Sequence, residues 1–444
     1  MRNRGPGPSD GCDPGPVSAL PGRQGREVLA GAAADDRAGT DLARRWRAAR
    51  SRSAVTHLDP AAAARPSQAT LDAQIAHLRR EGERGAYVAE MEAGEVLHSA
   101  RAALADLMGP GLGPDDLTFH HSASTAFAAL LTAWPLPPGA RVGVLPSEYG
   151  SNMLVLEARA RQAPFELIDL PVDPQGVIDL DVLDRAGMPS AQAARPLALA
   201  ELDLVVFPQV PSQRGIVQPA VEIGRRCTAA GVPLVLDVAQ SLGQIDVRDI
   251  HASAYLGTSR KWLCGPRGAG FLALRGDLAE RLNVGVPSLY TARRGEDGWP
   301  IPLPGLSRLA IGEASVASRV GLAQALTELL ASDPRLVFGR IVRLAAQGRR
   351  ALDGAGGWRV RERPDSPSGI ITLEPPPGVD PMAVRDRLYR QDAILTSAIP
   401  VQRSRDLEGP VLRVSAHVYN DPAEFEQLAA ALNRGPGSSS PART

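Results

Sequence analysis

The apolar run at residues 233–237, Pro-Leu-Val-Leu-Asp, constrains the fold of this chain more than any other stretch. A short apolar run bounded by turn residues is typical of a parallel strand that is buried on both faces of a sheet. The run ends on a carboxylate, Asp237, and open α/β sheets bind their ligands at the carboxyl ends of their strands. We therefore expect a mostly parallel sheet with a ligand site beside Asp237.

Strand and helix patterns alternate on both sides of this run, which predicts an α/β fold with helices on both faces of the sheet. We expect strands at 116–120, 141–145, 165–170, 203–208, 233–237, 253–257 and 269–274. We expect helices at 67–84, 87–108, 124–134, 151–162, 219–230 and 277–283.

After Pro304 the pattern changes to long helices followed by strands, which indicates a second, smaller α/β domain. Its expected helices are 315–332, 334–354, 380–390 and 421–433, and its expected strands are 357–361, 369–374, 393–397 and 411–415. We therefore expect a large domain at 67–304, a small domain at 305–433, and a segment at 41–66 that packs with the small one. Residues 1–40 and 434–444 are rich in Gly, Pro and Ser, and we expect both to be disordered.

Lys261 is the only lysine among 49 lysine and arginine residues. A single lysine left by chance is one explanation. Its position, 24 residues after Asp237 in a Ser/Arg/Gly-rich turn, favours a chemical role instead. A desolvated lysine can act as a nucleophile, whereas arginine does not readily lose its proton. We therefore predict that Lys261 forms a Schiff base with pyridoxal 5'-phosphate and that Asp237 pairs with the pyridinium nitrogen.

Two stretches offer contacts for the phosphate of this cofactor. Residues 122–125, Ser-Ala-Ser-Thr, pass from a strand into a helix, and the amides and hydroxyls of such a turn can hold a phosphate. An ordinary N-cap role for Ser122 or Ser124 is the alternative. Thr258 and Arg260, just before the lysine, add a hydroxyl and a guanidinium.

Other polar residues stand at expected strand ends. The ring of Tyr149 can stack on a flat cofactor, or pack on its own helix. Ser212 and Arg214 lie within reach of the cofactor or the substrate, although Arg214 in an ion pair is the alternative. Gln240 can bond the cofactor's phenolic oxygen. Arg413 stands in an apolar strand and needs an anionic partner, either a substrate carboxylate or an internal Asp or Glu.

Composition limits the possible partners. The formal net charge is zero and the arginines are dispersed, so we expect neither nucleic acid nor an anionic membrane as a partner. The three cysteines, Cys12, Cys227 and Cys264, form no metal-ligand spacing and no disulfide framework. Since no apolar run has membrane-spanning length and the N-terminal residues contain no apolar signal core, we expect a cytoplasmic protein.

Taken in order, these motifs resemble the class V aminotransferase family, the fold type I pyridoxal-phosphate enzymes that include cysteine desulfurases. The resemblance spans about residues 42–433 and is carried by His57-Leu-Asp-Pro-Ala-Ala, Ser122-Ala-Ser-Thr, Ser147-Glu-Tyr-Gly-Ser-Asn, Arg214-Gly-Ile-Val-Gln-Pro, Asp237-Val-Ala-Gln, Ser259-Arg-Lys-Trp and Leu412-Arg-Val-Ser. It implies a small-molecule substrate and a homodimer. It implies the cofactor contacts described above, with the phosphate held by Ala123, Ser124, Thr258 and Arg260. It also implies that Arg413 receives the substrate α-carboxylate, and we place Ala62 in the same substrate site.

The chain departs from the desulfurases of this family. They usually carry histidine at the positions of Tyr149 and Arg260, and a nucleophilic cysteine on a loop upstream of the carboxylate arginine. The corresponding loop here, residues 396–409, has no cysteine. We therefore favour a carbon–sulfur β-lyase over a desulfurase. Aminotransfer, epimerisation and a catalytically silent binding protein are the alternatives. For a quaternary ammonium group on the substrate, the candidates for an aromatic cage are His57, Tyr87, Trp262 and Tyr290. Because only 4% of the residues are aromatic, a carboxylate in that role is the alternative.

Overall fold

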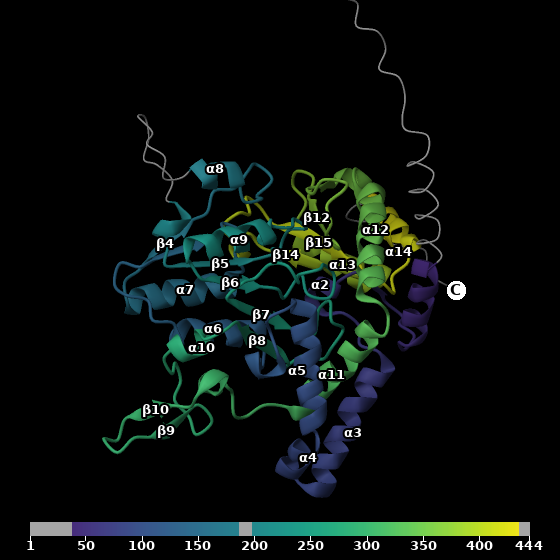
Figure 1. The fold of residues 1–444 in the computed structure, drawn as a ribbon. Coiled ribbons are helices and arrows are strands. Elements are labelled where there is room, and N and C mark those ends of the chain that lie inside the picture. The colour runs from purple at the N-terminus through teal and green to yellow at the C-terminus, as the bar shows by residue number, and fades with distance from the viewer. Residues whose placement is uncertain (1–37, 186–197, 435–444) are drawn as a thin grey trace, which may run out of the picture.

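The computed structural model describes residues 38–185 and 198–434 (Figure 1). The disorder expected at 1–37 and 435–444 lies outside these residues. A helix at residues 38–48 opens the described chain, three residues before the expected start at Asp41. Among the described residues, no helix combines the length and the apolar character needed to cross a bilayer.

Seven strands form the large sheet in the order β2-β8-β7-β6-β5-β3-β4. Their bounds are β2 (Leu117–His120), β3 (Arg141–Val144), β4 (Glu166–Asp169), β5 (Leu204–Pro208), β6 (Leu234–Asp237), β7 (Ala254–Thr258) and β8 (Gly270–Leu274). The strands from β3 to β7 are mutually parallel, and β8 runs antiparallel to both of its neighbours. All seven expected strands are confirmed to within one residue at each end, because each is an apolar run closed by turn residues.

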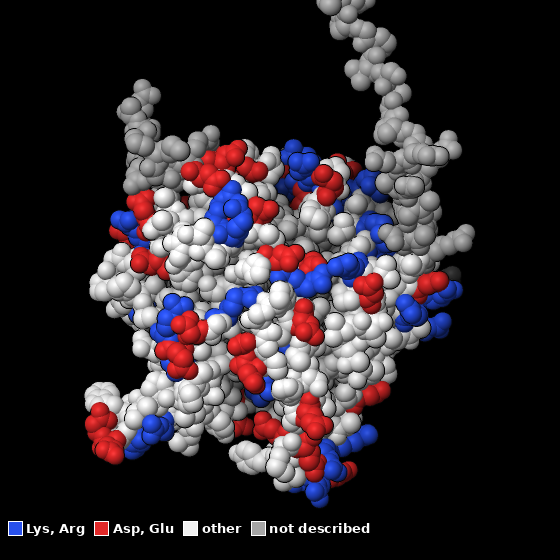
Figure 2. Space-filling model, viewed as in Figure 1, with Lys and Arg blue, Asp and Glu red and all other residues white. Residues whose placement is uncertain are grey.

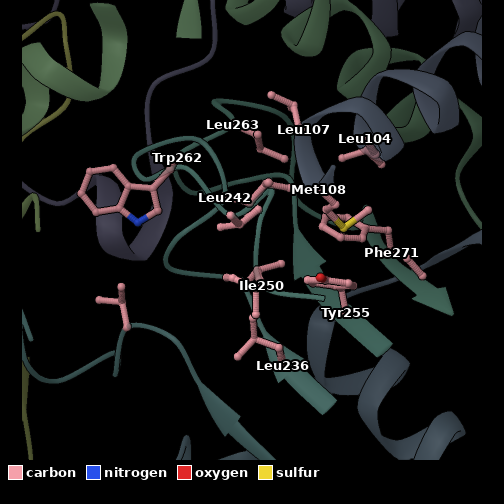
Figure 3. Close-up of a cluster of buried hydrophobic side chains, with 14 of the residues drawn as sticks. Leu104, Leu107, Met108, Leu236, Leu242, Ile250, Tyr255, Trp262, Leu263 and Phe271 are labelled. Carbon is pink, nitrogen blue, oxygen red and sulfur yellow. The ribbon is translucent and has the colours of Figure 1, made fainter. Parts of the chain in front are cut away.

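Helices cover both faces of this sheet, as expected. Side chains of β6 alternate, so that Leu236 faces one core with Leu104 of α5 (Gly94–Met108) and Ile223 of α9 (Ala220–Ala230). Val235 faces the other core with Phe127 of α6 (Ala123–Ala133). Figure 3 shows part of the first core, where Tyr255 lies near Met108 and Phe271, and Leu236 lies next to Ile250. Helices α7 (Gly150–Gln162) and α10 (Leu278–Arg281) also pack on this second face of the sheet.

One expected helix is broken. Instead of a continuous helix at 87–108, the chain forms α4 (Ala86–Glu92) and α5, with a turn at Ala93 between them. Gly94 follows the break, and glycine is a poor helix former, which lowers the cost of interrupting the helix there. The expected helix at 67–84 is confirmed as α3 (Gln68–Arg84), and α11 (Val316–Leu330) packs against α3 and α5.

A second, antiparallel sheet has the strand order β11-β12-β15-β14. Its strands are β11 (Arg359–Val360), β12 (Ile370–Glu374), β14 (Ser397–Ile399) and β15 (Val411–Ser415), and its helices are α12 (Pro334–Leu352), α13 (Pro381–Asp392) and α14 (Pro422–Asn433). The strand expected at 393–397 is divided, because β13 (Ile394–Leu395) leaves this sheet to pair with β1 (Thr56–His57). That pairing ties the N-terminal segment to the C-terminal part of the chain.

The remaining elements are short. They are α2 (Pro60–Ala63), α8 (Leu180–Arg185), β9 (Ala292–Arg294), β10 (Pro300–Pro302) and the 3-10 turns η1 (Pro114–Asp116), η2 (Leu199–Glu201), η3 (Gly305–Leu309), η4 (Ala355–Gly357) and η5 (Val401–Arg403). The β9–β10 hairpin projects away from the body of the molecule (Figure 1). Basic and acidic side chains are interspersed over the face seen in Figure 2.

Candidate active site

Two adjoining cavities lie where the carboxyl ends of β5, β6 and β7 meet the second sheet and α2. The inner cleft, about 40 Å³, is lined by Ser122, Ala123, Ser124, Tyr149, Pro208, Val210, Ser212, Asp237, Ala239, Gln240, Thr258, Arg260 and Lys261. The outer cavity, about 590 Å³, shares Tyr149, Ser212, Gln240, Arg260 and Lys261 with it. All eight residues predicted to bind the cofactor line the inner cleft, and Ala62 and Arg413 line the outer cavity.

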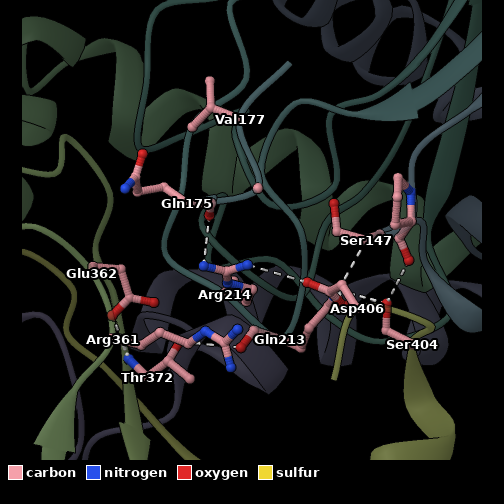
Figure 4. Close-up of polar contacts among 12 residues, drawn as sticks. Ser147, Gln175, Val177, Gln213, Arg214, Arg361, Glu362, Thr372, Ser404 and Asp406 are labelled. Atoms are coloured by element: carbon pink, nitrogen blue, oxygen red, sulfur yellow. Dashed lines mark hydrogen bonds and ion pairs between the residues drawn. The ribbon is translucent and has the colours of Figure 1, made fainter. Parts of the chain in front are cut away.

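Arg214 lines neither cavity. Its guanidinium donates to the carbonyl oxygen of Gln175 at 2.6 Å and pairs with Asp406 at 3.6 Å, as Figure 4 shows. The ion-pair alternative therefore describes this residue, and its assignment to the substrate site is not supported. The direction of the side chain depends on two loops distant in sequence, at Gln175 and Asp406, which no local pattern reveals.

Lys261 is buried at the junction of the two cavities. Burial lowers the pKa of its amine to about 7, the Asp237 carboxylate opposes this shift, and Arg260, Arg403 and Arg413 add to it. Its Nζ lies 5.9 Å from the centre of the Tyr149 ring. The amine is thus deprotonated in a substantial fraction of molecules near neutral pH, which a nucleophilic lysine requires.

Asp237 is held in place at the end of β6. Its Oδ1 accepts from the backbone amide of Ala239 at 2.8 Å, and its Oδ2 accepts from Nδ2 of Asn152 at 3.2 Å. Burial raises the pKa of this carboxyl, while the charge of Lys261 and the two hydrogen bonds lower it. A buried carboxylate with a fixed direction is suited to pairing with a cationic ring nitrogen.

Glu148 is a second buried carboxyl in this network, and no pattern in the sequence predicted a role for it. Its exposed fraction is 0%, and its Oε1 accepts from the amide of Tyr149 at 2.8 Å and from Asn152 Nδ2 at 3.0 Å. Burial and the nearby Asp237 together raise its pKa to about 8. Asn152 therefore bridges two buried carboxyl groups. The place of Glu148 beside Tyr149 at a strand end was the only sequence signal.

Replacing Glu148 with glutamine is expected to stabilise the protein at high pH. The pKa of Glu148 is higher in the folded than in the unfolded protein. Its contribution to the free energy of unfolding is therefore largest below about pH 4.5 and is lost as pH rises through about 8. Glutamine resembles the protonated form and does not titrate. We expect the melting temperatures of Glu148→Gln and the wild type to diverge as pH rises from 5 to 8. A pH-independent difference would contradict this, and Glu157→Gln, at an exposed position of the helix α7 that follows Glu148, is the control.

Arg413 has an internal partner. Its Nη2 donates to Oδ1 of Asp59 and to Oγ of Ser397, both at 3.1 Å, and its Nη1 donates to the carbonyl oxygen of Ser212 at 2.7 Å. Its Nε, however, is buried without a partner among the described residues. Asp59 thus forms an ion pair with Arg413. Arg413 lines the outer cavity, and its Nε–H group is still free to donate a hydrogen bond.

Gln240 is also fixed by its neighbours. Its Nε2 donates to the carbonyl oxygen of Ala61 at 2.9 Å, and its Oε1 accepts from the indole of Trp262 at 2.8 Å. A primary amide has two N–H donors, so one remains for a ligand in the cleft.

Both serines of the loop that opens α6 line the inner cleft, and one of them also caps the helix. Ser122 is the N-cap, since its side chain accepts from the amide of Thr125 at 3.2 Å. Ser124 lines the inner cleft together with Ala123, Thr258 and Arg260. A side chain on Gly270 of β8 would stand 2.4 Å from the carbonyl carbon of Ser122, so glycine permits this loop to lie against the sheet.

This donor set fits pyridoxal 5'-phosphate. The cleft offers a buried amine at Lys261, a carboxylate at Asp237, an amide donor at Gln240 and an aromatic ring at Tyr149. A helix N-terminus, hydroxyls and a guanidinium are arranged for a phosphate.

The expected aromatic cage does not form around the outer cavity. His57, Tyr87, Trp262 and Tyr290 are all absent from its lining, because Trp262 is committed to Gln240 and the others lie elsewhere. Instead, Tyr389 of α13 lines it, with 53% of its surface exposed. Because α13 reaches the cavity only through the packing of the second sheet, no local sequence signal identified it.

The sheet order and the buried lysine–aspartate pair define the fold type I architecture of pyridoxal-phosphate-dependent transferases. Residues 56–428 match the family model described as Aminotransferase class-V, and the chain belongs to the class V aminotransferase family.

Relatives within the family have different activities. The chain is 40% identical over 407 residues to a probable hercynylcysteine sulfoxide lyase of Mycobacterium tuberculosis, which covers 91% of this chain and 96% of the relative. It is 28% identical to an isopenicillin N epimerase of Streptomyces clavuligerus, over 76% of this chain and 84% of the relative. The cysteine desulfurase CsdA of Escherichia coli has a similar fold, with a TM-score of 0.76, 20% identity, and coverage of 88% of this chain and 98% of the other.

Proposed function

We propose that this protein is a pyridoxal-phosphate-dependent carbon–sulfur β-lyase that cleaves hercynylcysteine sulfoxide to pyruvate, ammonia and a sulfenic acid, which is then reduced to ergothioneine. One observation carries the choice of lyase over desulfurase. Of the two cysteines in the described chain, neither Cys227 nor Cys264 lines the inner cleft or the outer cavity, and burial raises the pKa of both thiols to about 12. A thiol that stays protonated and buried cannot capture the released sulfur. The substrate assignment draws on the relative from Mycobacterium tuberculosis.

The loop that borders the outer cavity is bound to the large sheet. Ser404 accepts from Nε2 of Gln213 at 2.7 Å and contacts the carbonyl oxygen of Pro146, while Asp406 accepts from Gln213 at 2.9 Å (Figure 4). Arg405 forms an ion pair with Asp169. These contacts support a loop that serves as a wall of the substrate site rather than as a carrier of sulfur.

Each residue at the junction has a defined task in this mechanism. Pyridoxal phosphate, when bound, supplies the electron sink for the pair that remains on Cα after the proton leaves. The neutral Nζ of Lys261 accepts that proton, which the lowered pKa permits. Asp237 keeps its negative charge directed at the ring nitrogen, and Arg413 orients the substrate through its α-carboxylate.

Cleavage of the Cβ–S bond sends the electron pair to sulfur. A sulfenate leaves more readily than a thiolate because its charge lies on oxygen. The three-carbon fragment is released and hydrolysed to pyruvate and ammonia. We assign reduction of the sulfenic acid to an external thiol, because both described cysteines are buried.

Tyr389 supports the substrate assignment. A half-exposed aromatic ring at the wall of the outer cavity offers its face to a quaternary ammonium group, such as the trimethylammonium of hercynine. Asp386 lines the same cavity, although it pairs with Arg385 at 2.6 Å.

We further propose a cytoplasmic homodimer, with the boundary between its two domains near residue 304. Exposed apolar side chains on and before the β9–β10 hairpin, including Val286, Leu289 and Trp299, support an interface in that region.

The decisive experiment supplies the purified protein, loaded with pyridoxal phosphate, with hercynylcysteine sulfoxide and an excess of dithiothreitol. We expect pyruvate and ergothioneine to form in equal amounts, as measured by a lactate dehydrogenase-coupled assay and by chromatography. Absence of pyruvate, together with alanine formation from cysteine or exchange between an amino acid and a keto acid, would contradict the lyase assignment.

A further inference from the structure

Four arginines line the two cavities that meet at Lys261, and an anion is already assigned to two of them. Arg260 lines the inner cleft, where the cofactor phosphate is expected, and Arg413 lies beside Asp59 at the α-carboxylate position. The third, Arg403, lines the outer cavity only. Among the described residues, its guanidinium takes part in no hydrogen bond or ion pair. Arg385, which also lines this cavity, is neutralised by the adjacent Asp386.

The backbone of Arg403 is held in place by hydrogen bonds of its own loop and by close packing against Gly150. Its amide donates to the carbonyl oxygen of Pro400 at 3.0 Å, and the next residue, Ser404, is buried and bound to Gln213. A side chain on Gly150 would stand 2.6 Å from the carbonyl oxygen of Arg403 and 3.8 Å from its Cδ. Arg403 therefore lies against the first residue of α7, directly after Tyr149.

A cation at this place favours one kind of ligand. An arginine with no protein partner at the wall of a cavity gains most from an anion that it can bind through charge-assisted hydrogen bonds. The phosphate and the α-carboxylate are accounted for on the inner side. The anion that remains must belong to the part of the substrate beyond the sulfur, which occupies the outer cavity.

We infer that Arg403 binds a second carboxylate, carried by the substituent on the substrate's sulfur, and thereby selects cysteine S-conjugates whose leaving group is anionic. This inference rests on the proposed function. It makes Arg403 a specificity residue that acts on the leaving group, at a distance from the atoms that react. Tyr389, on the wall of the same cavity, provides the complementary site for a cation, so a leaving group with both charges fits best.

The test compares two substrates that differ only in the distal group. S-(2-carboxyethyl)-L-cysteine sulfoxide ends in a carboxylate, and S-propyl-L-cysteine sulfoxide ends in a methyl group at the same position. For Arg403→Gln we expect kcat/KM with the first compound to fall about tenfold to a hundredfold, mainly through KM, since a hydrogen bond to a charged group is lost. We expect the second compound to change by less than about twofold. Arg403→Lys should restore part of the loss, and Gln402→Ala, an exposed neighbour, is the control for the loop.

Binding alone provides a second readout. In the Lys261→Ala background loaded with pyridoxal phosphate, calorimetry should show tighter binding of the carboxyethyl compound than of the propyl compound, and Arg403→Gln should remove that preference. An equal loss for both compounds, or no loss for either, would overturn the role of Arg403. If the preference depends on Arg403 while the wild type releases no pyruvate from any sulfoxide, the proposed lyase activity fails and the anion site stands.

Discussion

Replacing Lys261 with arginine is expected to abolish pyruvate release, with a fall in kcat of at least about a thousandfold. The substitution keeps the positive charge in the site but removes the amine. A guanidinium stays protonated throughout the accessible pH range, so it can neither bind the cofactor covalently nor accept the Cα proton. The buried amine of the wild type has a pKa of about 7 and can do both. The measurements are single-turnover pyruvate release and the visible absorbance of the protein after excess cofactor has been removed.

Two further variants serve as controls for Lys261→Arg. Lys261→Ala should lose activity to the same extent, because the charge is not what matters. Arg267→Lys introduces a lysine at an exposed position of the same loop and should behave like the wild type. If Lys261→Arg retained more than about a tenth of the wild-type rate, the covalent role of Lys261 would be refuted.

Asp237→Asn has the second-largest expected effect, a fall in kcat of about a hundredfold or more. The amide has nearly the same shape but no charge, so it cannot keep the ring nitrogen of the cofactor protonated. Lys261 is unchanged, and the protein should still bind the cofactor. The loss should therefore fall on kcat, with little change in the amount of cofactor bound per protein.

The pH dependence of the absorbance of the bound cofactor is the readout that separates charge from packing. It should shift in Asp237→Asn and stay unchanged in Asp184→Asn, a carboxylate that pairs with Arg226 on the surface. Asp237→Glu keeps the charge but lengthens the side chain, and should lose less kcat than asparagine. A rise in KM with kcat preserved in Asp237→Asn would sink the electrostatic role.

Short-range patterns in the sequence were sufficient for most of the fold. Strand β6 is an apolar run that ends at Asp237, and such runs predicted all seven strands of the large sheet to within one residue. The helix expected at 87–108 was broken in the structure, because the interruption at Ala93 depends on how α4 and α5 pack and not on periodicity. The division of the strand at 393–397 likewise required β1, a segment more than 300 residues away in sequence.

The chemistry of the candidate site was partly readable in the same way. Lys261 and Asp237 were notable by residue type and position, and both line the inner cleft. The hydrogen-bond and ion-pair partners of the site residues could not be predicted from the sequence. Asn152 connects Glu148 to Asp237, and Asp59 meets Arg413 across 354 positions of the chain.

The sequence by itself determined the strand order along the chain, the type of cofactor chemistry and the residues at the strand ends, because these follow from local periodicity and side-chain type. Only the tertiary structure decided which way the arginines point. Arg214 turns away to Asp406, Arg413 is held by Asp59, and Arg403 is left facing the outer cavity. The physical reason is that a long charged side chain is directed by partners from distant segments, and those partners meet only when the two sheets pack together.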